Sequence, residues 1–454
     1  MKILVCVKVI KGEINPFDES ALECALRLSE DVTVVSMGPK SSEDVLKPLT
    51  RLGAKAVLIT DSLFAGSDTL ATSYILSTAI KQTEYDLILC GRQSVDGDTA
   101  QVGPMLSTRL GCGLITNALS IERTESGIKV KTRTGEENTS LPALVTVERG
   151  YILRFPSIFS KLGQVKILDN SDLKCDESSC GLKGSPTRVL QTFENVRGKR
   201  HCKFIDKTEL RQLIAELSGK EIARKAKSEQ PQKLKSVWAI GEEVLEKAQE
   251  IAEKVILIEK TDVRDIVKKA MTEKPEVILW NADFWGRKNA PVASAMLNTG
   301  LCADCTELDA DGDTLIMYRP AQGGRLYAKI KCLTYPQMAT VRTKTQSSDI
   351  ILSMGKGAAN DTDSLKAFAD EIGAELAASR GLVDMGKAEY DFQVGLTGKT
   401  VSPKIYIAVG ISGAVHHTCA IEGADTVIAV NPDKEARIFE YSDYGVLASS
   451  DEII

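Results

Sequence analysis

The chain is poor in histidine and in aromatic residues. It has only three histidines among 454 residues, and Phe, Trp and Tyr together make up 5%. So few aromatic side chains argue against a stacking surface for single-stranded nucleic acid. The net charge of -5 gives no overall basic field that would attract nucleic acid or an anionic membrane. The sequence therefore predicts no nucleic-acid partner.

Long apolar segments are also lacking. No run of about 18 apolar residues occurs, so we expect no membrane insertion. The first ten residues, MKILVCVKVI, place one lysine before an apolar run, as a signal peptide does, but no small-residue cleavage site follows. They alternate like a buried strand, and we interpret them as the first strand of the fold.

The cysteines show no disulfide framework. There are eleven, an odd number without regular spacing. This pattern is typical of a reducing cytoplasm, where cysteine serves as a small apolar residue, and we expect a cytoplasmic protein. Cys302-Ala-Asp-Cys305 and the pair Cys175/Cys180 are open to a metal or redox interpretation. A lone C-x-x-C without a nearby histidine is weak evidence for zinc, so we predict no metal site.

What the sequence does contain is a repeated alternation of strand and helix patterns. Alternation fills the first 150 residues, stops over 171–232, restarts at KSVWAIG and restarts again at SSDIILSMGKGAAN. Such alternation predicts parallel sheets covered by helices on both faces, with ligands at the carboxyl ends of the strands. We predict three doubly wound α/β units, over residues 1–230, 231–345 and 346–454.

The second unit echoes the first. The stretch LILCGRQSVDGDTAQVGPMLSTRLGCGLITNALSIE lines up with VILWNADFWGRKNAPVASAMLNTGLCADCTELDADG. Both contain an apolar strand, a polar loop, a helix with small residues and a polar strand. Internal duplication is the plain interpretation.

A glycine-rich loop, GRQSVDGDTAQVGP, follows one predicted strand of the first unit. It carries Gly91, Gly97 and Gly103 and leads into a helix. The backbone amides of such a loop form an anion site suited to phosphate. An ordinary Asp-Gly turn, with Asp98 or Thr99 capping the helix, explains the same residues equally well.

A second loop, in YIAVGISGAVHHT, ends in two adjacent histidines. Its glycines let the backbone approach a ligand closely, and Ser412 offers a hydroxyl near a helix start. Neighbouring histidines on a helix point about 100° apart, so His416 and His417 cannot share one metal. The motif is not the Gly-x-Ser-x-Gly elbow of hydrolases. We interpret it as a cofactor-cradling loop with one histidine facing the cofactor.

Arg380 lies in a polar loop before this motif. An arginine buried among polar loop residues suits an anion or a ring contact, and the alternative is a solvated surface charge.

These motifs resemble, in sequence order, those of the electron-transfer flavoproteins. The FAD domain of that family's α subunit is similar to SR (379–380), QVGLTG (393–398), YIAVGISGAVHH (406–417), AVN (429–431) and DYG (443–445). Its first domain is similar to TGLCADCTELD, RPAQGG and PQMATVR, and the β subunit to VDGDTAQVGP, LPALVTVERG, FPSIFSK and GLKGSPTRV. The resemblance covers nearly the whole chain as a β–α fusion joined near 228–234. It implies two adenine-nucleotide-hydrolase-like units followed by a C-terminal FAD-binding domain.

The resemblance also implies a FAD site. Arg380 would lie against the isoalloxazine ring and raise the flavin potential, and His417 would donate to the N1/C2 carbonyl edge. The full set of implied FAD-binding residues is Lys356, Ser379, Arg380, Gln393, Val394, Gly395, Leu396, Thr397, Ser412, Gly413, Ala414, Val415, His416, His417 and Asn431.

Some positions depart from the family. Lys356 stands where arginine is usual, His416 replaces a glutamine, and SRGLVD replaces Ser-Arg-Pro. Ser449 occupies the place of an acid that contacts adenine. The α-like first domain is also shorter than usual.

The β-like half implies a second nucleotide. The family ordinarily holds AMP there, whereas its electron-bifurcating branch holds a second FAD that accepts electrons from NADH. The loop DGDTAQVGP is similar to that branch, so a second FAD is favoured over AMP or an empty loop. The implied residues are Val7, Gly91, Asp96, Gly97, Asp98, Thr99, Ala100, Gln101 and Val102.

RFPSIFSKLGQVK is similar to the family's partner-recognition loop, with Phe155 in place of the anchoring leucine. The resemblance therefore implies an electron carrier between a flavoprotein dehydrogenase, such as an acyl-CoA dehydrogenase type, and a downstream acceptor, with NADH as a further donor. A nucleotide-binding regulatory or structural protein that kept the fold is the alternative. An NADH-oxidising flavoenzyme that acts alone is a third.

Overall fold

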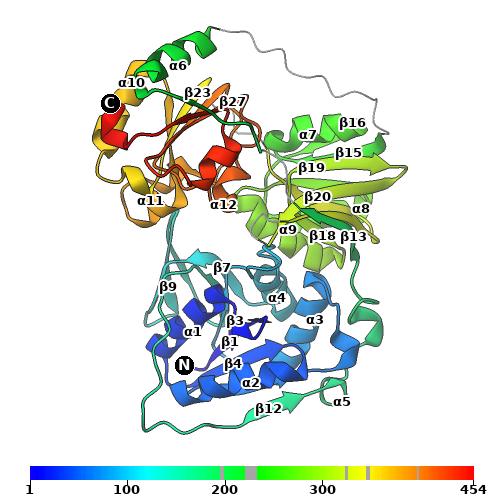
Figure 1. The fold of residues 1–454 in the computed structure, drawn as a ribbon. Helices are drawn as coiled ribbons and strands as arrows, with labels where there is room; N and C mark the ends of the chain where they lie inside the picture. Colours follow the sequence, from blue (N-terminus) through cyan, green and yellow to red (C-terminus); the bar gives the residue numbers. More distant parts are fainter. Residues whose placement is uncertain (195–198, 220–232, 323–325, 344–347, 396–397) are drawn as a thin grey trace. The chain divides into compact units, whose positions relative to one another are not determined.

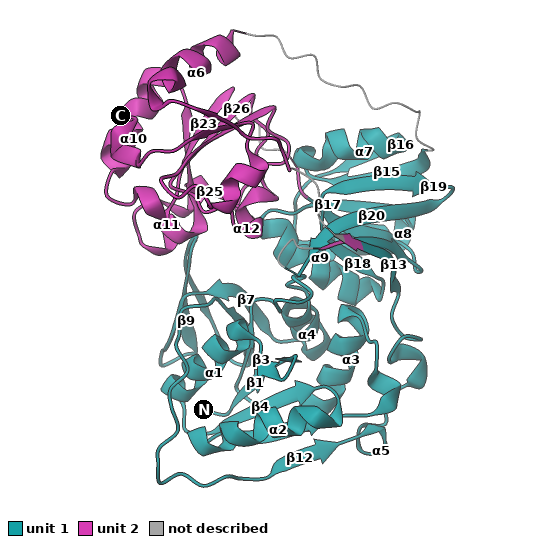
Figure 2. Cartoon of the chain, viewed as in Figure 1, with its two compact units in different colours: residues 1–192, 231–322, 328–341 teal, residues 193–230, 323–327, 342–454 magenta. Residues whose placement is uncertain are grey.

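The structure is a computed structural model that describes residues 1–194, 199–219, 233–322, 326–343, 348–395 and 398–454. The chain forms two compact units (Figure 2). Unit 1 comprises residues 1–192, 231–322 and 328–341, and unit 2 comprises residues 193–230, 323–327 and 342–454. The boundaries expected after residues 230 and 345 stay predictions.

Unit 1 begins with a seven-stranded parallel sheet in the order β12-β5-β4-β1-β6-β11-β7 (Figure 1). Its strands are β1 Ile3–Cys6, β4 Val32–Met37, β5 Lys55–Ile59, β6 Leu87–Gly91, β7 Gly113–Ala118, β11 Ala143–Val147 and β12 Val165–Leu168. The helices around it are α1 Pro16–Leu28, α2 Glu43–Leu46, α3 Thr69–Ile80, α4 Val102–Leu110 and α5 Asn170–Leu173.

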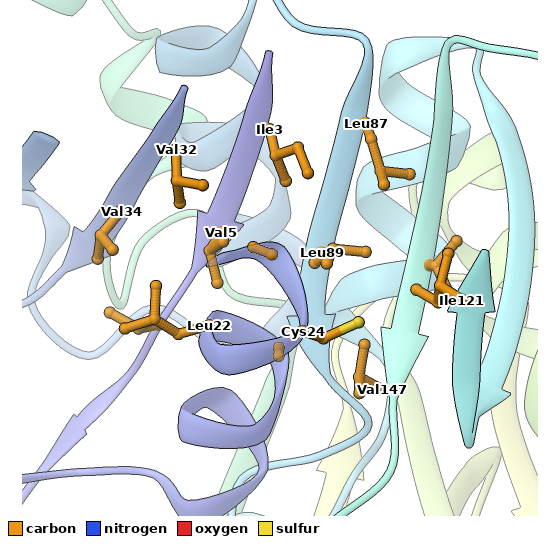
Figure 3. Packing of buried hydrophobic residues seen from close by; sticks show 14 of the residues in the cluster. Ile3, Val5, Leu22, Cys24, Val32, Val34, Leu87, Leu89, Ile121 and Val147 are labelled. Carbon is orange, nitrogen blue, oxygen red and sulfur yellow. The ribbon is translucent and has the colours of Figure 1, made fainter. Parts of the chain in front are cut away.

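Both faces of this first sheet are buried. On one face Leu22 and Cys24 of α1 pack against β1, β4 and β6, as Figure 3 shows. On the other, Ile75 of α3 and Leu106 of α4 form a separate apolar cluster. The predicted parallel sheet with helices on both faces is therefore confirmed.

A five-stranded parallel sheet follows in unit 1, in the order β16-β15-β17-β22-β18. Its strands are β15 Leu234–Ile240, β16 Ala252–Ile258, β17 Val277–Asn281, β18 Leu301–Cys305 and β22 Gln337–Val341, and its helices are α7 Leu245–Ile251, α8 Val263–Glu273 and α9 Phe284–Leu297. Three strands are inserted between β7 and β11 of the first sheet: β8 Ser120–Arg123, β9 Ile128–Thr132 and β10 Gly135–Thr139. Three are likewise inserted between β18 and β22 of the second sheet: β19 Glu307–Asp311, β20 Thr314–Ala321 and β21 Leu326–Cys332.

The two sheets of unit 1 match in detail, which supports the predicted duplication. In α4, Ser107 Oγ donates to the Cys112 carbonyl at 2.9 Å, and in α9, Ser294 Oγ donates to the Thr299 carbonyl at 2.6 Å. Both hydroxyls satisfy a carbonyl just beyond the end of their helix, where intrahelical donors are lacking.

A second matched detail is a bulge in β7 and β18. Asn117 has φ 63° and Asp304 has φ 57°, and their N–H groups donate to Thr146 Oγ1 at 2.9 Å and Thr340 Oγ1 at 2.8 Å. The bulge breaks the ladder register, and the threonine hydroxyl accepts from the N–H that the ladder leaves unpaired.

Unit 2 holds a third sheet, parallel throughout, in the order β14-β28-β27-β26-β23-β24-β25. Its strands are β14 Lys203–Ile205, β23 Ile350–Met354, β24 Glu375–Ser379, β25 Gln393–Val394, β26 Ile405–Val409, β27 Thr426–Val430 and β28 Tyr444–Val446, and its helices are α6 Leu210–Ser218, α10 Thr362–Ile372, α11 Arg380–Asp384 and α12 Val415–Thr418. Helix α6 buries Leu210, Ile214 and Leu217 in the core of this unit. No described helix meets the length and hydropathy that a membrane crossing requires.

Thr340→Val is expected to lower the free energy of unfolding of unit 1 by about 1–3 kcal/mol, because it leaves the buried Asp304 N–H without an acceptor. Trp238, Trp280 and Trp285 all lie in or beside the second sheet, so tryptophan fluorescence during urea unfolding reports on this change. The exposed Thr272→Val on α8 is the control and should shift stability by less than about 0.5 kcal/mol. Equal effects of the two variants would contradict the assigned role of Thr340.

Candidate functional site

The carboxyl ends of β1, β4 and β6 in unit 1 open into a cavity of about 690 Å³. Val7 follows β1, Gly38 and Pro39 follow β4, and Gly91 ends β6, so the cavity lies where ligands bind doubly wound sheets. The first turns of α3 and α4 complete the wall through Thr69 and Val102.

Most of the residues predicted for the nucleotide line this cavity. They are Val7, Gly91, Gly97, Thr99, Ala100, Gln101 and Val102. The acids Asp96 and Asp98 are not among its lining residues. Asp96 forms an ion pair with Lys8 at 2.7 Å, and Asp98 accepts from the Gln93 side-chain amide at 3.0 Å. Both carboxylates thus brace the loop.

The loop before α4 is also held from the second sheet of unit 1. Arg319 on β20 donates to the Asp98 carbonyl at 3.1 Å. The Gln101 side chain accepts from Thr69 Oγ1 at 2.6 Å and donates to the Leu301 carbonyl at 3.0 Å. The N-cap residue of α4 is Gln101, and its side chain makes no capping hydrogen bond. A capping role for Asp98 or Thr99 stays a prediction.

Asp18 is a site residue that sequence reasoning missed. Its carboxylate lines the cavity, is 6% exposed, and accepts from the Lys8 and Gly91 amides at 2.8 and 2.9 Å. Burial raises its pKa to about 7, although these amides act in the opposite direction. The segment INPFDESALE (14–23), which contains this residue, gives no sign that it reaches the end of β6.

In unit 2 the predicted FAD residues gather at the carboxyl edge of the third sheet. Strand β23 lies between β26 and β24, so the chain leaves it in opposite directions on its two sides, which is the switch point of such sheets. The loops after β23 and β26 touch there: the Gly357 N–H donates to the Gly410 carbonyl at 3.0 Å. A Cβ at Gly355 would lie 2.1 Å from that same carbonyl oxygen.

The other half of the edge brings Lys356, Arg380 and Val394 together. The Lys356 stem covers Gly381, where a Cβ would meet it at 2.8 Å, and Ser379 is paired with Val394 across β24 and β25. Arg380 is 32% exposed at its side chain, with Nε 3.2 Å from Asp384 Oδ2. Arg380 is thus a half-buried, paired cation. It is intermediate between the buried anion or ring contact and the solvated surface charge that the sequence left open.

The two histidines differ as predicted. His416 is exposed, whereas His417 is 6% exposed and its Nε2 lies 2.9 Å from the Tyr406 hydroxyl. Burial lowers the pKa of His417 to about 4 against the opposing effect of the Val394 carbonyl. Its Nδ1 makes no well-aligned hydrogen bond within the described residues, although the Val394 backbone lies close enough to favour an N–H on the ring. A buried, neutral imidazole with one such nitrogen fits the carbonyl edge of a flavin.

The remaining predicted FAD residues shape the edge mainly with their backbone. Gly395 packs against the His416 carbonyl, Ala414 is the N-cap of the single turn α12, and Ser412 is exposed. Asn431 donates to the Ile411 carbonyl at 3.0 Å and so holds the loop after β26. Gln393 and Gly413 are buried, Val415 is half-buried, and Leu396 and Thr397 lie outside the described residues.

Two other predicted features are distinct from these sites. Phe155 is 95% exposed, with Ile152, Ile158 and Phe159 nearby in sequence and each at least 85% exposed. Cys175, Cys180, Cys302 and Cys305 are buried free thiols. Within the described part of the chain, no three His, Cys, Asp or Glu side chains group as metal ligands.

Comparison with known proteins identifies the family to which this chain belongs. The electron transfer flavoprotein domain matches residues 3–156 and 223–365, and the electron transfer flavoprotein FAD-binding domain matches residues 344–422. The chain belongs to the electron transfer flavoprotein family. Relatives named as subunit beta and as subunit alpha match different halves of it, which is consistent with a β–α fusion.

Three relatives illustrate the match. The electron transfer flavoprotein subunit beta of Thermoanaerobacterium thermosaccharolyticum is 41% identical over 196 residues, covering 39% of this chain and 75% of the relative. Subunit alpha of the same organism is 37% identical over 236 residues, covering 42% of this chain and 72% of the relative. Protein FixB of Azorhizobium caulinodans is 36% identical over 244 residues, covering 42% and 66%.

Asp18 should make the stability of the protein depend on pH. Its pKa is about 7 when folded and is expected near the ordinary value of 3.8 when unfolded. The folded state thus retains a proton that the unfolded state loses, so this stabilisation is full below about pH 4 and is lost as the pH rises through 7. Urea unfolding at pH 5 and pH 8, followed by circular dichroism, should show a smaller loss in Asp18→Asn than in the wild type.

Asp44→Asn is the matched control, since Asp44 is exposed in the same unit. A wild-type profile retained in Asp18→Asn would show that Asp18 is ionised in the folded protein at both pH values.

Proposed function

We propose that the chain carries electrons one at a time between a flavoprotein dehydrogenase and a downstream acceptor, through FAD bound at the carboxyl edge of the third sheet. The observation that carries this proposal is His417, a buried neutral imidazole beside glycine loops that approach each other too closely for side chains. Membership of the family supports it as well, because family members pass electrons between dehydrogenases and acceptors. When bound, FAD supplies the reversible redox chemistry of its isoalloxazine ring.

In this proposal each residue has a separate task. Arg380 places a positive charge at the ring, and Asp384 holds its guanidinium in position. His417 offers a nitrogen to the carbonyl edge without adding charge. The loops after β23 and β26 hold the ribityl and phosphate portion, and Asn431 fixes the second of these loops through Ile411.

The cavity of unit 1 is proposed to hold a second nucleotide. Its polar loop and the uncapped start of α4 suit a phosphate, and its volume of about 690 Å³ is within the range of cofactor pockets. The loop sequence favours FAD over AMP there, with NADH as the electron donor to that FAD. A cytoplasmic location is proposed from the eleven free cysteines.

Residues 152–162 are proposed to dock the redox partner. Exposed Phe155, Ile158 and Phe159 provide apolar anchors, and Arg154 and Lys161 provide basic neighbours for an acidic dehydrogenase surface. Arg154 is itself oriented by Glu23, 2.9 Å away.

The purified protein is expected to be yellow, with two FAD and no AMP per chain on acid extraction and chromatography. One FAD with AMP would contradict bifurcation, and a colourless chain that cannot be reconstituted with FAD would favour the regulatory alternative. Rapid reduction of dyes by NADH without a partner protein would favour the stand-alone enzyme.

Gly413→Ala should remove the FAD of unit 2, lowering the count by one. Gly413 has φ 82°, and a Cβ there would lie 2.1 Å from the Ile438 nitrogen, so the loop must shift. Gly373→Ala is the control, because Gly373 has a similar φ of 66° with open space around it and ends α10 away from the site. Equal FAD counts in the two variants would place the cofactor elsewhere.

Arg380→Ala is expected to lower the reduction potential of the flavin in unit 2. Loss of one half-buried cation removes about 1–2 kcal/mol of stabilisation from the reduced ring, on the order of 40–90 mV for one electron. Potentiometric titration measures this shift. Lys366→Ala on α10 removes an exposed cation of the same unit as the control. An unchanged potential in Arg380→Ala would contradict the proposed position of Arg380 beside the isoalloxazine ring.

A further inference from the structure

Tyr406 is a buried tyrosine in the central strand β26 whose hydroxyl lies against His417. It is 0% exposed, and its hydroxyl oxygen is 2.9 Å from His417 Nε2, with the ring planes at 53°. The Ser353 side chain also lies within hydrogen-bonding reach of this hydroxyl. Neither the redox chemistry nor the family match assigns it a role.

The protons of this pair can be placed from burial. Burial raises the pKa of Tyr406 above its ordinary value, so the phenol keeps its proton, and burial lowers the pKa of His417, so the imidazole carries one N–H. If Tyr406 donates to Nε2, the remaining N–H of the ring is on Nδ1. If Nε2 donates instead, the phenol O–H must turn toward Ser353, and Nδ1 carries a lone pair that faces the Val394 carbonyl.

The first arrangement is the more stable. A buried polar group without a hydrogen-bond partner is costly, so buried hydroxyls and ring nitrogens are nearly always bonded. The second arrangement would set the lone pair of Nδ1 against the Val394 carbonyl, whereas the first directs the Nδ1–H toward it. The Val394 carbonyl also favours an N–H on the ring, because it acts to raise the pKa of His417.

We propose that Tyr406 is a positioning residue whose hydroxyl donates to Nε2 of His417 and thereby fixes the Nδ1–H tautomer, so that His417 meets the flavin edge as a hydrogen-bond donor. The proposal rests on the proposed function, since it needs FAD at the edge of the third sheet. It explains how His417 can donate a hydrogen bond from Nδ1 to the flavin while the imidazole stays neutral. With the other tautomer, Nδ1 would present a lone pair to the flavin carbonyl and repel it.

The tautomer can be observed directly, without flavin. The chain has only three histidines, so ¹⁵N-histidine labelling of the full-length, flavin-free protein gives few signals, and His201→Asn and His416→Gln assign two of them. The expected result at pH 7 is a neutral His417 with a pyrrole-type Nδ1 and a pyridine-type Nε2. In Tyr406→Phe the ratio of the two tautomers should shift toward Nε2–H by a factor of about 10.

The flavin potential provides the second measurement. In the FAD-loaded protein, Tyr406→Phe should lower the potential of the flavin in unit 2, whereas Tyr441→Phe should not, although it removes a hydroxyl from another buried tyrosine of that unit. In a His417→Gln background, Tyr406→Phe should produce no further shift, because the hydroxyl acts through the imidazole.

An Nε2–H signal in the wild type, or an unchanged tautomer ratio in Tyr406→Phe, would overturn the proposal. An equal shift of potential with and without His417 would overturn it as well, since Tyr406 would then act by another route. A protein that shows the Nδ1–H form but binds no FAD in unit 2 would overturn the proposed function, and with it the flavin-facing role, while leaving the tyrosine–histidine pair intact.

Discussion

The close approach of backbone loops at the carboxyl ends of parallel strands is the constraint on which both candidate sites depend. In unit 2 the loops after β23 and β26 are so close that a Cβ at Gly355 would lie 2.1 Å from the Gly410 carbonyl. In unit 1 a Cβ at Gly91 would lie 2.3 Å from Asp18 Oδ1. Glycine is required at both places because another atom already occupies the position of a side chain. The space that remains open is lined by N–H groups and small residues, which suits a nucleotide.

The two sheets of unit 1 share a fold but differ at the carboxyl ends of their strands, where a ligand would bind. The second sheet repeats the strand order, the bulge and the helix-end serine of the first. At the carboxyl ends of its strands, however, Lys260 reaches Glu243 and Asp283 and lies over the Trp285 ring. A Cβ at Gly241 would lie 2.7 Å from the Lys260 side chain. This lysine therefore fills the space at the strand ends of the second sheet that corresponds to the cavity of the first sheet. The two copies thus share the arrangement of their strand ends and differ in whether a long side chain fills the space beside them.

The sequence predicted the parallel sheets and the duplication, because strand–helix periodicity and loop motifs are local features. The binding residues stay predictions, although most of those in unit 1 line the cavity. It did not predict Asp18, whose effect comes from contact with residues 73 positions away at Gly91. It also left Asp98 and Thr99 open as helix caps, since spacing alone does not show that Gln101 turns toward Thr69 and Leu301. The difference between His416 and His417 was predicted because helical geometry separates neighbouring side chains, whereas the Tyr406 contact required the register between a strand and a turn.

Burial shifts the two buried titratable groups in opposite directions and for the same reason. Desolvation raises the pKa of Asp18 and lowers that of His417, so each is driven toward its uncharged form. At pH 7 His417 is thus neutral, whereas Asp18, with a pKa of about 7, is divided between its neutral and its charged form. Full positive charge is left to Arg380, which is only half-buried and balanced by Asp384. In the proposed function, the flavin of unit 2 can therefore change its charge without a change in the protonation of His417, because the pKa of this imidazole lies well below neutral pH.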